Sequence, residues 1–231
     1  MKKPVFCSEL AWLVGLCLIA WGTALTVWAD LGVSTVVAPA FILHLAMKNV
    51  WEWFSFGISE YVLQAFVLIL MMLLLQKIKI RYFLSFGAAI IYGILLDLGT
   101  FLIGHLLPIE ASFSAQIGVY VLGNLGVCCG VALMIRTYLP PEIYEMFIKE
   151  ITHLGAFQIR TVKTLYDCAS LLLALILSLA LLGKIEGIGI ATLICALFNG
   201  IIIDRIGILL DKLWDFRDIF PLRPKFEEGV D

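Results

Sequence analysis

Four carboxylates lie within or near the ends of long apolar segments of this chain: Glu60, Asp97, Asp167 and Asp204. A charged group inside a hydrocarbon layer costs several kcal/mol and persists mainly where it faces a cavity or a partner. Such groups can bind a ligand, act as gates or carry protons. The structural alternative is a side chain that reaches the headgroups from a segment end. Asp97 lies deepest, roughly 10 Å from the end of its segment.

Two pairs of opposite charges occur at the spacing of one helical turn. Lys163 and Asp167 are four residues apart and can form an ion pair on one helix face, which is the structural alternative for both residues. Glu145 and Lys149 have the same spacing, which predicts a surface pair, with a role in lining a pathway as the alternative.

Polar residues also follow the first apolar segment, which breaks at Asp30 and continues with Ser34 and Thr35. Their side-chain oxygens can cap the short helix expected next. In the functional alternative, the broken helix presents free N–H groups and the positive end of its dipole to an anionic substrate group. Asn124 and Asn199 lie within later apolar segments, where hydrogen bonds between helices are expected. Asn199 also remains a candidate for substrate binding.

Sequence motifs for other chemistry are missing. The chain has no phosphate-binding loop, no dinucleotide fingerprint and no protease or β-lactamase motif. Its three histidines are scattered, and its six cysteines show no metal-type spacing. We therefore predict no metal site, no cofactor and no enzymatic activity, and a nucleotide-driven pump acting alone is excluded.

The composition is that of an integral membrane protein. Of the 231 residues, 62% are hydrophobic and only 15% are charged, and the mean hydropathy is +1.03. Because lipid offers no hydrogen-bond partners to the backbone, the apolar segments must be helices. Six are long enough to span a bilayer, over about 10–29, 58–76, 82–104, 115–136, 162–182 and 186–208. Two further helices, about 36–48 and 141–154, are too short to cross.

Basic residues fix the expected orientation, because lysine and arginine accumulate in cytoplasmic loops. With six spans, every lysine and arginine except Lys48 and Lys184 falls on one side. We therefore expect a multi-pass membrane protein with both termini in the cytoplasm.

The first segment recurs weakly about 108 residues later, where Gly15 and Gly22 match Gly123 and Gly130. At nearly the same offset, Glu60 matches Asp167 and Asp97 matches Asp204. Three spans per repeat is an odd number, so the second repeat must be inverted relative to the first. We predict one membrane domain, with repeats over about 1–110 and 111–212 and a cytoplasmic tail over about 213–231.

The chain resembles the YczE/YyaS/YitT-like group of bacterial integral membrane proteins, a largely uncharacterised family. The resemblance rests on Gly22-x-Ala-Leu with Ala29-Asp30-Leu31-Gly32-x-Ser34, on Val162-Lys163-Thr164-x-x-x-Asp167, and on Gly187-Ile188-Gly189-x-x-Thr192 through Asn199-Gly200. It covers about residues 10–212 and implies six spans in a bacterial cytoplasmic (inner) membrane. It implies no substrate and no catalytic residue.

These observations favour a secondary-type transporter or exporter of a small polar or amphipathic solute, in which one repeat rocks against the other. The candidate substrate-binding or gating residues are Asp30, Ser34, Thr35, Glu60, Asp97, Lys163, Asp167, Asn199 and Asp204. Two alternatives stay open. One is a substrate-binding membrane subunit that works with an energy-coupling partner, and the other is a non-transporting accessory protein. The expected partners are the lipid bilayer and a small-molecule substrate, with a homo-oligomer as a further possibility and no nucleic acid.

Overall fold

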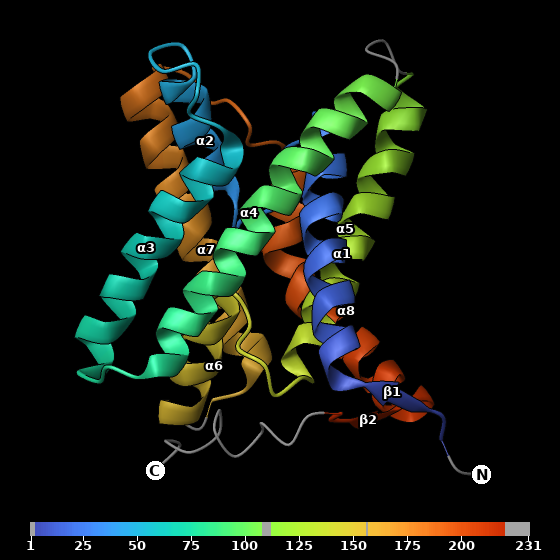
Figure 1. The fold of residues 1–231 in the computed structure, drawn as a ribbon. Helices are drawn as coiled ribbons and strands as arrows, with labels where there is room; N and C mark the ends of the chain where they lie inside the picture. The colour runs from blue at the N-terminus through green and yellow to red at the C-terminus, as the bar shows by residue number, and fades with distance from the viewer. Residues whose placement is uncertain (1–2, 108–111, 156, 220–231) are drawn as a thin grey trace.

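The computed structural model describes residues 3–107, 112–155 and 157–219, and most of these residues are helical (Figure 1). Within these described residues, six helices are long and apolar enough to cross a membrane. They are α1 (Ser8–Ala29), α3 (Phe56–Leu75), α4 (Ile80–Leu106), α5 (Phe113–Ile135), α7 (Ile159–Leu177) with a π-helical turn, η1 (Ser178–Leu182), and α8 (Ile190–Leu213). The predicted all-α membrane fold with six spans is confirmed, with helix ends shifted by a few residues.

Local sequence explains several of the helix ends. Ser55 precedes α3 and its hydroxyl accepts the N–H of Ile58 at 3.1 Å, while the hydroxyl of Ser112 accepts the N–H of Ala115 at the start of α5. Such bonds satisfy N–H groups that have no partner inside the helix. At the other end of a helix, Asp30 closes α1 in the left-handed conformation, with φ of 53°.

Two short helices lie at opposite ends of the bundle. In Figure 1, α2 (Ala38–Met47) lies at the upper side, and α6 (Ile143–Gly155) lies at the lower side. Each follows the first span of its half of the chain, as the sequence predicts. Neither is long enough to cross a bilayer on its own, since a span requires about 20 residues.

The start of α2 differs from the prediction. We expected Asp30, Ser34 and Thr35 to cap this helix through their side chains, but the helix has no side-chain cap. The N–H groups of the two residues ahead of Pro39 donate to the backbone carbonyl of Ser34 instead, at 3.2 and 3.0 Å. Pro39 in the first turn has no N–H that would need a partner. The backbone turn therefore replaces the expected side-chain cap.

Helices α1 and α5 form the most closely packed pair of the bundle. A Cβ atom added to Gly22 would lie 2.5 Å from the carbonyl oxygen of Gly123, and one added to Gly123 would lie 2.7 Å from that of Gly22. Gly15 and Gly130 make the equivalent contact further along the two helices. A Cβ atom added to Gly15 would lie 2.9 Å from the carbonyl oxygen of Gly130, and one added to Gly130 would lie 2.5 Å from that of Gly15. Only glycine lets two helix backbones approach this closely. Since Gly15 pairs with Gly130 and Gly22 with Gly123, the two helices run antiparallel.

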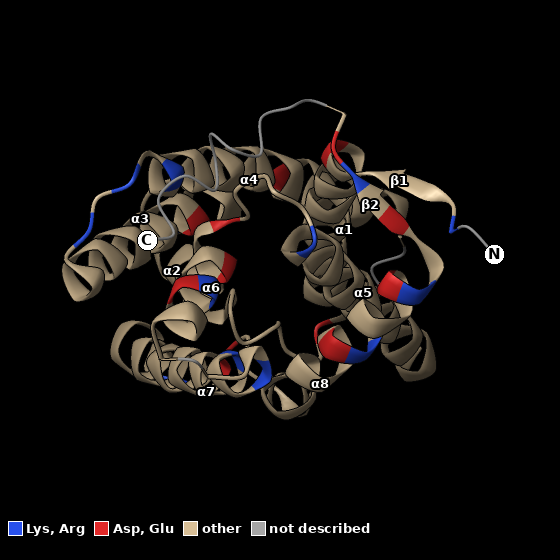
Figure 2. Ribbon diagram, turned by 90° about the horizontal axis from the view of Figure 1, so that it is seen from below, with Lys and Arg blue, Asp and Glu red and all other residues tan. Residues whose placement is uncertain are grey.

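The remaining helices pack around this pair in matching ways in the two halves. Helix α4 packs on α1 and α3, and α8 packs on α5 and α7. Each short helix contacts the second span of both halves, α2 against α3 and α7, and α6 against α7 and α3. Seen from below in Figure 2, α6 lies within the outline of the longer helices. This arrangement agrees with an inverted repeat, which remains a prediction.

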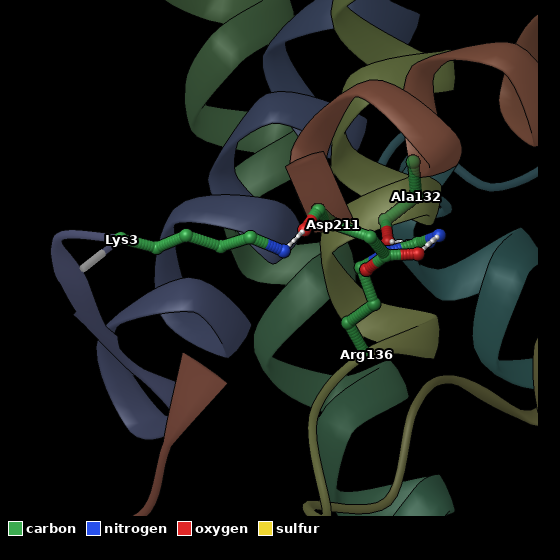
Figure 3. Close-up of polar contacts among 4 residues, drawn as sticks. All are labelled: Lys3, Ala132, Arg136 and Asp211. Atoms are coloured by element: carbon green, nitrogen blue, oxygen red, sulfur yellow. Dashed lines mark hydrogen bonds and ion pairs between the residues drawn. The ribbon is translucent and has the colours of Figure 1, made fainter. Parts of the chain in front are cut away.

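A small polar assembly lies at one edge of the lower side of the bundle, beside the ends of α1, α5 and α8 (Figure 2). Strand β1 (Val5–Cys7) pairs in parallel with β2 (Asp215–Arg217), which the sequence did not predict. Beside it, the guanidinium of Arg136 donates two hydrogen bonds to the carboxylate of Asp211, at 2.6 and 2.7 Å, and a third to the carbonyl of Ala132 (Figure 3). Lys3 donates to the backbone carbonyl of Asp211. The ends of α5 and α8 are thereby joined. Residues 220–231 of the predicted tail lie outside the described residues.

Candidate functional site

A buried network of hydrogen bonds links α3 to the start of α6. The hydroxyl of Tyr144 donates to Glu60 Oε2 at 2.8 Å, and Gln64 Nε2 donates to Glu142 Oε2 at 3.1 Å. The carbonyl oxygen of the Gln64 side chain accepts the N–H of Ile143 at 3.2 Å. One element of the first half and one of the second therefore share a single polar network inside the bundle.

The network leaves acceptor atoms without partners. Glu60 is 0% exposed and Glu142 is 2% exposed, yet the Oε1 atom of each has no hydrogen-bond partner. A buried polar atom without a partner costs about 1–3 kcal/mol. Native proteins keep few such atoms, and those that persist often mark a functional site. These two oxygens are therefore the first candidates for contact with a ligand or a proton.

A second buried group lies on α7, where Lys163 Nζ is 3.1 Å from Asp167 Oδ1. Both side chains are nearly inaccessible, at 8% and 1% exposure. The predicted ion pair is confirmed. Thr35, which is fully buried in the connection between α1 and α2, lies against the Asp167 carboxylate. Asp167 thus meets the break after α1 much as Glu60 meets the break after α5.

A small cavity of about 30 Å³ lies between these two groups. Its wall includes residues from both halves of the chain. The polar residues of this wall are Thr23, Ser34, Tyr92, Glu142, Tyr144, Glu145, Lys163 and Asn199. The volume is that of about one water molecule or one small cationic group. We call this space the central cavity.

A larger cavity of about 300 Å³ opens toward the lower side, between α5, α6, α7 and α8. Four of its wall residues, Val131, Glu145, Lys163 and Ile203, also line the central cavity. We call this larger space the vestibule. Glu145 and Lys163 are the charged residues of this shared wall, so they lie between the vestibule and the central cavity.

The electrostatics of the short helix α6 follow from its burial. Removal from water raises the pKa of Glu142 well above its usual value, and the neighbouring carboxylates of Glu145 and Glu60 raise it further. Burial also raises the pKa of Glu145, although Lys163 opposes this increase. A raised pKa means that the fold favours the protonated carboxylic acid. These two groups therefore hold a proton at a higher pH than exposed glutamates do.

The structure brings most of the sequence-predicted site residues to this centre. Glu60, Lys163 and Asp167 lie in the two buried groups, and Thr35 lies beside the second. Ser34 and Asn199 line the central cavity itself. The amide of Asn199 also exchanges two hydrogen bonds with that of Asn124, at 3.0 and 3.2 Å, which confirms the expected contact between α5 and α8.

Three predicted residues lie elsewhere. Asp97 accepts hydrogen bonds from Ser55 Oγ at 2.6 Å and from the N–H of Gly57 at 2.8 Å, so it binds the start of α3. Asp30 ends α1 and lines a groove between α5 and α8 on the upper side. Asp204 lines the vestibule but not the central cavity.

Sequence reasoning missed residues at the centre. Gln64 and Glu142 were not candidates, and Glu145 was expected on the surface, whereas it is only 8% exposed and faces both cavities. The surface interpretation of Glu145 is wrong because α6 lies inside the bundle. A usable signal was present in Glu142-x-x-Glu145 directly after two prolines, since two carboxylates at a membrane break are unusual.

The described residues also bear on metal binding. Nowhere in 3–107, 112–155 and 157–219 do three histidine, cysteine, aspartate or glutamate side chains gather as metal ligands. The carboxylates of the centre are instead joined through amide, phenol and ammonium groups. This donor set suits hydrogen bonding and charge pairing.

The fold and the buried centre define a multi-pass α-helical membrane protein with polar groups enclosed between its two halves. The chain belongs to a family of unknown function, DUF6198, whose model matches residues 6–207. No curated protein and no solved structure matches the chain.

Proposed function

We propose that the protein is a secondary transporter or exporter that moves a small polar or amphipathic solute by alternating access. The observation that carries this proposal is the vestibule, which opens toward the lower side and shares Glu145 and Lys163 with the wall of the central cavity. A protein that only scaffolds a complex has no need of a solute-sized space ending at buried charges. Binding sites at the midplane between two halves are typical of secondary transporters.

The packing of the two halves supports a rocking mechanism. Each short helix contacts the second span of the opposite half, and each second span carries a buried carboxylate next to a helix break. In an inverted repeat, the conformation of one half can be exchanged with that of the other, which moves the opening to the opposite side. The central cavity then stays in place while access to it changes sides.

The orientation of the chain in the membrane and its relationship to a known group of proteins form part of the proposal. With the termini in the cytoplasm of a bacterium, the vestibule opens to the cytoplasm and the structure corresponds to an inward-facing state. The proposed relationship to YczE/YyaS/YitT-like proteins rests on the quoted motifs, several of which lie at the central cavity or around the break after α1. Carboxylates of the centre would couple flux to a gradient of protons or other ions.

Flux in proteoliposomes tests this function and requires no identified substrate. Vesicles that contain the wild-type protein are loaded with a bacterial metabolite extract, given a pH gradient, and analysed by mass spectrometry for solutes lost. We expect at least one solute to leave only in the presence of the protein and the gradient. Asp167→Asn should abolish this loss, because it removes one buried charge of the centre.

Two further variants separate transport from folding. Asp167→Asn leaves Lys163 buried without its partner, which can cost several kcal/mol. The double variant Lys163→Met/Asp167→Asn removes both charges, so it should fold but not transport. Glu150→Gln is the matched control, since Glu150 pairs with Lys79 at 3.7 Å outside the two cavities. Equal solute loss from wild-type and protein-free vesicles would refute the proposal.

A further inference from the structure

We propose that the substrate is a small organic amine, bound as a primary ammonium in the central cavity with its apolar body in the vestibule, and exchanged for a proton on Glu142. This inference rests on the proposed function and names its substrate class. It follows from the balance of buried charges, from the acceptors left without partners, and from the sizes and linings of the two adjacent cavities.

The buried centre carries more acid than base. Four carboxylates, Glu60, Glu142, Glu145 and Asp167, are at most 8% exposed, and the only buried basic side chain recorded among the described residues is Lys163. Several uncompensated negative charges cannot persist in an environment of low dielectric constant. Protons or a bound cation must therefore neutralise the carboxylates that Lys163 leaves unpaired. Both neutralising species are positive, so the centre selects cations.

The central cavity has the acceptor and the size that a primary ammonium requires. Glu142 lines this cavity and its Oε1 atom lacks a hydrogen-bond partner. A volume of about 30 Å³ admits a water-sized group and excludes a quaternary ammonium. Tyr92 and Tyr144 also line the cavity, and aromatic rings attract cations through their electron-rich faces. Carboxylate, hydroxyl and aromatic groups together are suited to hold an ammonium.

The vestibule supplies room for an apolar body. Val131, Ile135, Ile148, Ile159 and Ile203 form much of its wall. These aliphatic side chains offer no hydrogen bonds to a polar solute, whereas they favour a hydrocarbon or aromatic chain. An amine whose nitrogen lies in the central cavity would extend its carbon skeleton along this wall.

The basic residues of the vestibule do not reverse this selection. The Arg136 guanidinium already donates to Asp211 and to the Ala132 carbonyl, and Lys163 is paired with Asp167. Arg160 and His153 are exposed and Lys149 is half-buried, and none of the three lines the central cavity. The charges closest to the central cavity are thus a paired lysine and the carboxyl groups of Glu142 and Glu145.

Exchange with a proton follows from competition for one carboxyl group. Protonated Glu142 is neutral, so it must lose its proton to the solvent before it can pair with an ammonium, and the amine enters already protonated. No covalent bond of the amine changes, and one positive charge replaces another. The charged and titratable groups around Glu142 are Glu60 from α3, Tyr92 from α4, Tyr144 and Glu145 from α6, and Lys163, Tyr166 and Asp167 from α7.

Binding of benzylammonium chloride to the purified protein in detergent tests the inference. Calorimetry measures affinity, and phenol red in weakly buffered phosphate reports protons released. We expect benzylammonium to bind with release of up to one proton and with an affinity that rises up to tenfold per pH unit while Glu142 remains protonated. Benzyl alcohol and benzoate, which share the ring but lack the cation, should not bind.

Variants assign the proton to its carboxyl group. Glu142→Gln should abolish proton release and weaken benzylammonium binding at least tenfold, and Glu145→Gln should weaken it as an independent check if the first variant fails to fold. Glu150→Gln should bind like the wild type.

Binding of benzoate, equal binding of ammonium or potassium ions, or undiminished proton release by Glu142→Gln would each overturn the inference. Amine binding with proton release but without flux would refute transport alone, whereas flux of other solutes without amine binding would refute the amine alone.

Discussion

Gln64 Nε2 donates a hydrogen bond of 3.1 Å to Glu142 Oε2, which joins α3 in the first half of the chain to the residue just ahead of α6 in the second. The bond fixes one oxygen of the Glu142 carboxyl and leaves the other directed to no protein donor. The candidate site is therefore built by tertiary contact between the halves. Movement of either half must strain or break this bond, which couples the site to the proposed rocking motion.

The first prediction concerns the pH dependence of stability. The pKa of Glu142 is raised in the folded protein, so the native state holds a proton that the unfolded chain releases at lower pH. The contribution of this proton to the free energy of unfolding is complete below the pKa of Glu142 in the unfolded chain, about 4.5. It is lost as the pH rises through the raised pKa of Glu142 in the folded protein. One proton contributes a slope of about 1.4 kcal/mol per pH unit within this window.

Thermal unfolding in detergent, recorded across the pH range, checks this slope. Glu142→Gln carries a neutral side chain of the same size, so its melting temperature should depend less on pH and should exceed that of the wild type under alkaline conditions. Parallel curves for the two proteins would mean that Glu142 does not hold the proton.

The second prediction concerns the packing of α1 on α5. In Gly22→Ala, the added Cβ would lie 2.5 Å from the carbonyl oxygen of Gly123, so the two helices must separate. We expect a loss of about 1–3 kcal/mol, as for other overpacked sites. Gly126→Ala is the matched control on α5, because its nearest contacts are 3.6 and 3.7 Å and the methyl group fits. Similar melting temperatures for both variants would contradict the close approach.

The sequence predicts the spans well because lipid forces each apolar segment into a helix. It predicts much less about the polar centre. Glu60 and Asp167 are recognisable as carboxylates in apolar segments, but only the fold shows that each meets a break from the opposite half. Gln64 carries no charge and shows no local signal, and its role depends on Glu142, which lies 78 residues away.

The depth of a carboxylate in its segment did not predict its neighbours in the fold. Asp97 lies deep in α4, yet its partners are Ser55 and Gly57 at the start of a neighbouring helix, which the sequence cannot place beside it. The strands β1 and β2 were missed for another reason. Each has three residues, which is too short for an alternating pattern, and their pairing joins the two ends of the chain.

The third prediction follows from the contacts of Asp97. Asp97→Ala removes both hydrogen bonds to the start of α3, so we expect a loss of about 1–3 kcal/mol in unfolding free energy. Asp97→Asn keeps one acceptor oxygen and should be milder. Folded protein of either variant should bind benzylammonium like the wild type, because Asp97 does not line the central cavity or the vestibule. A folded Asp97→Asn that neither binds nor transports would restore a direct role for this carboxylate.

The fourth prediction concerns Arg136 and Asp211 at the edge of the vestibule. The Asp211 side chain is 56% exposed, so this ion pair should contribute less than about 1 kcal/mol, and Asp211→Asn should unfold near the wild-type temperature. Its effect on binding should be larger, because the guanidinium of Arg136, a vestibule residue, is then no longer neutralised. The positive charge of Arg136 then repels an incoming ammonium by a fraction of a kcal/mol. The affinity for benzylammonium should therefore fall about two- to threefold at low salt. High salt should restore it.

The double variant Arg136→Gln/Asp211→Asn, which lacks both charges, should bind like the wild type at every salt concentration. If Asp211→Asn instead binds the amine more tightly, the vestibule does not conduct a cation past Arg136.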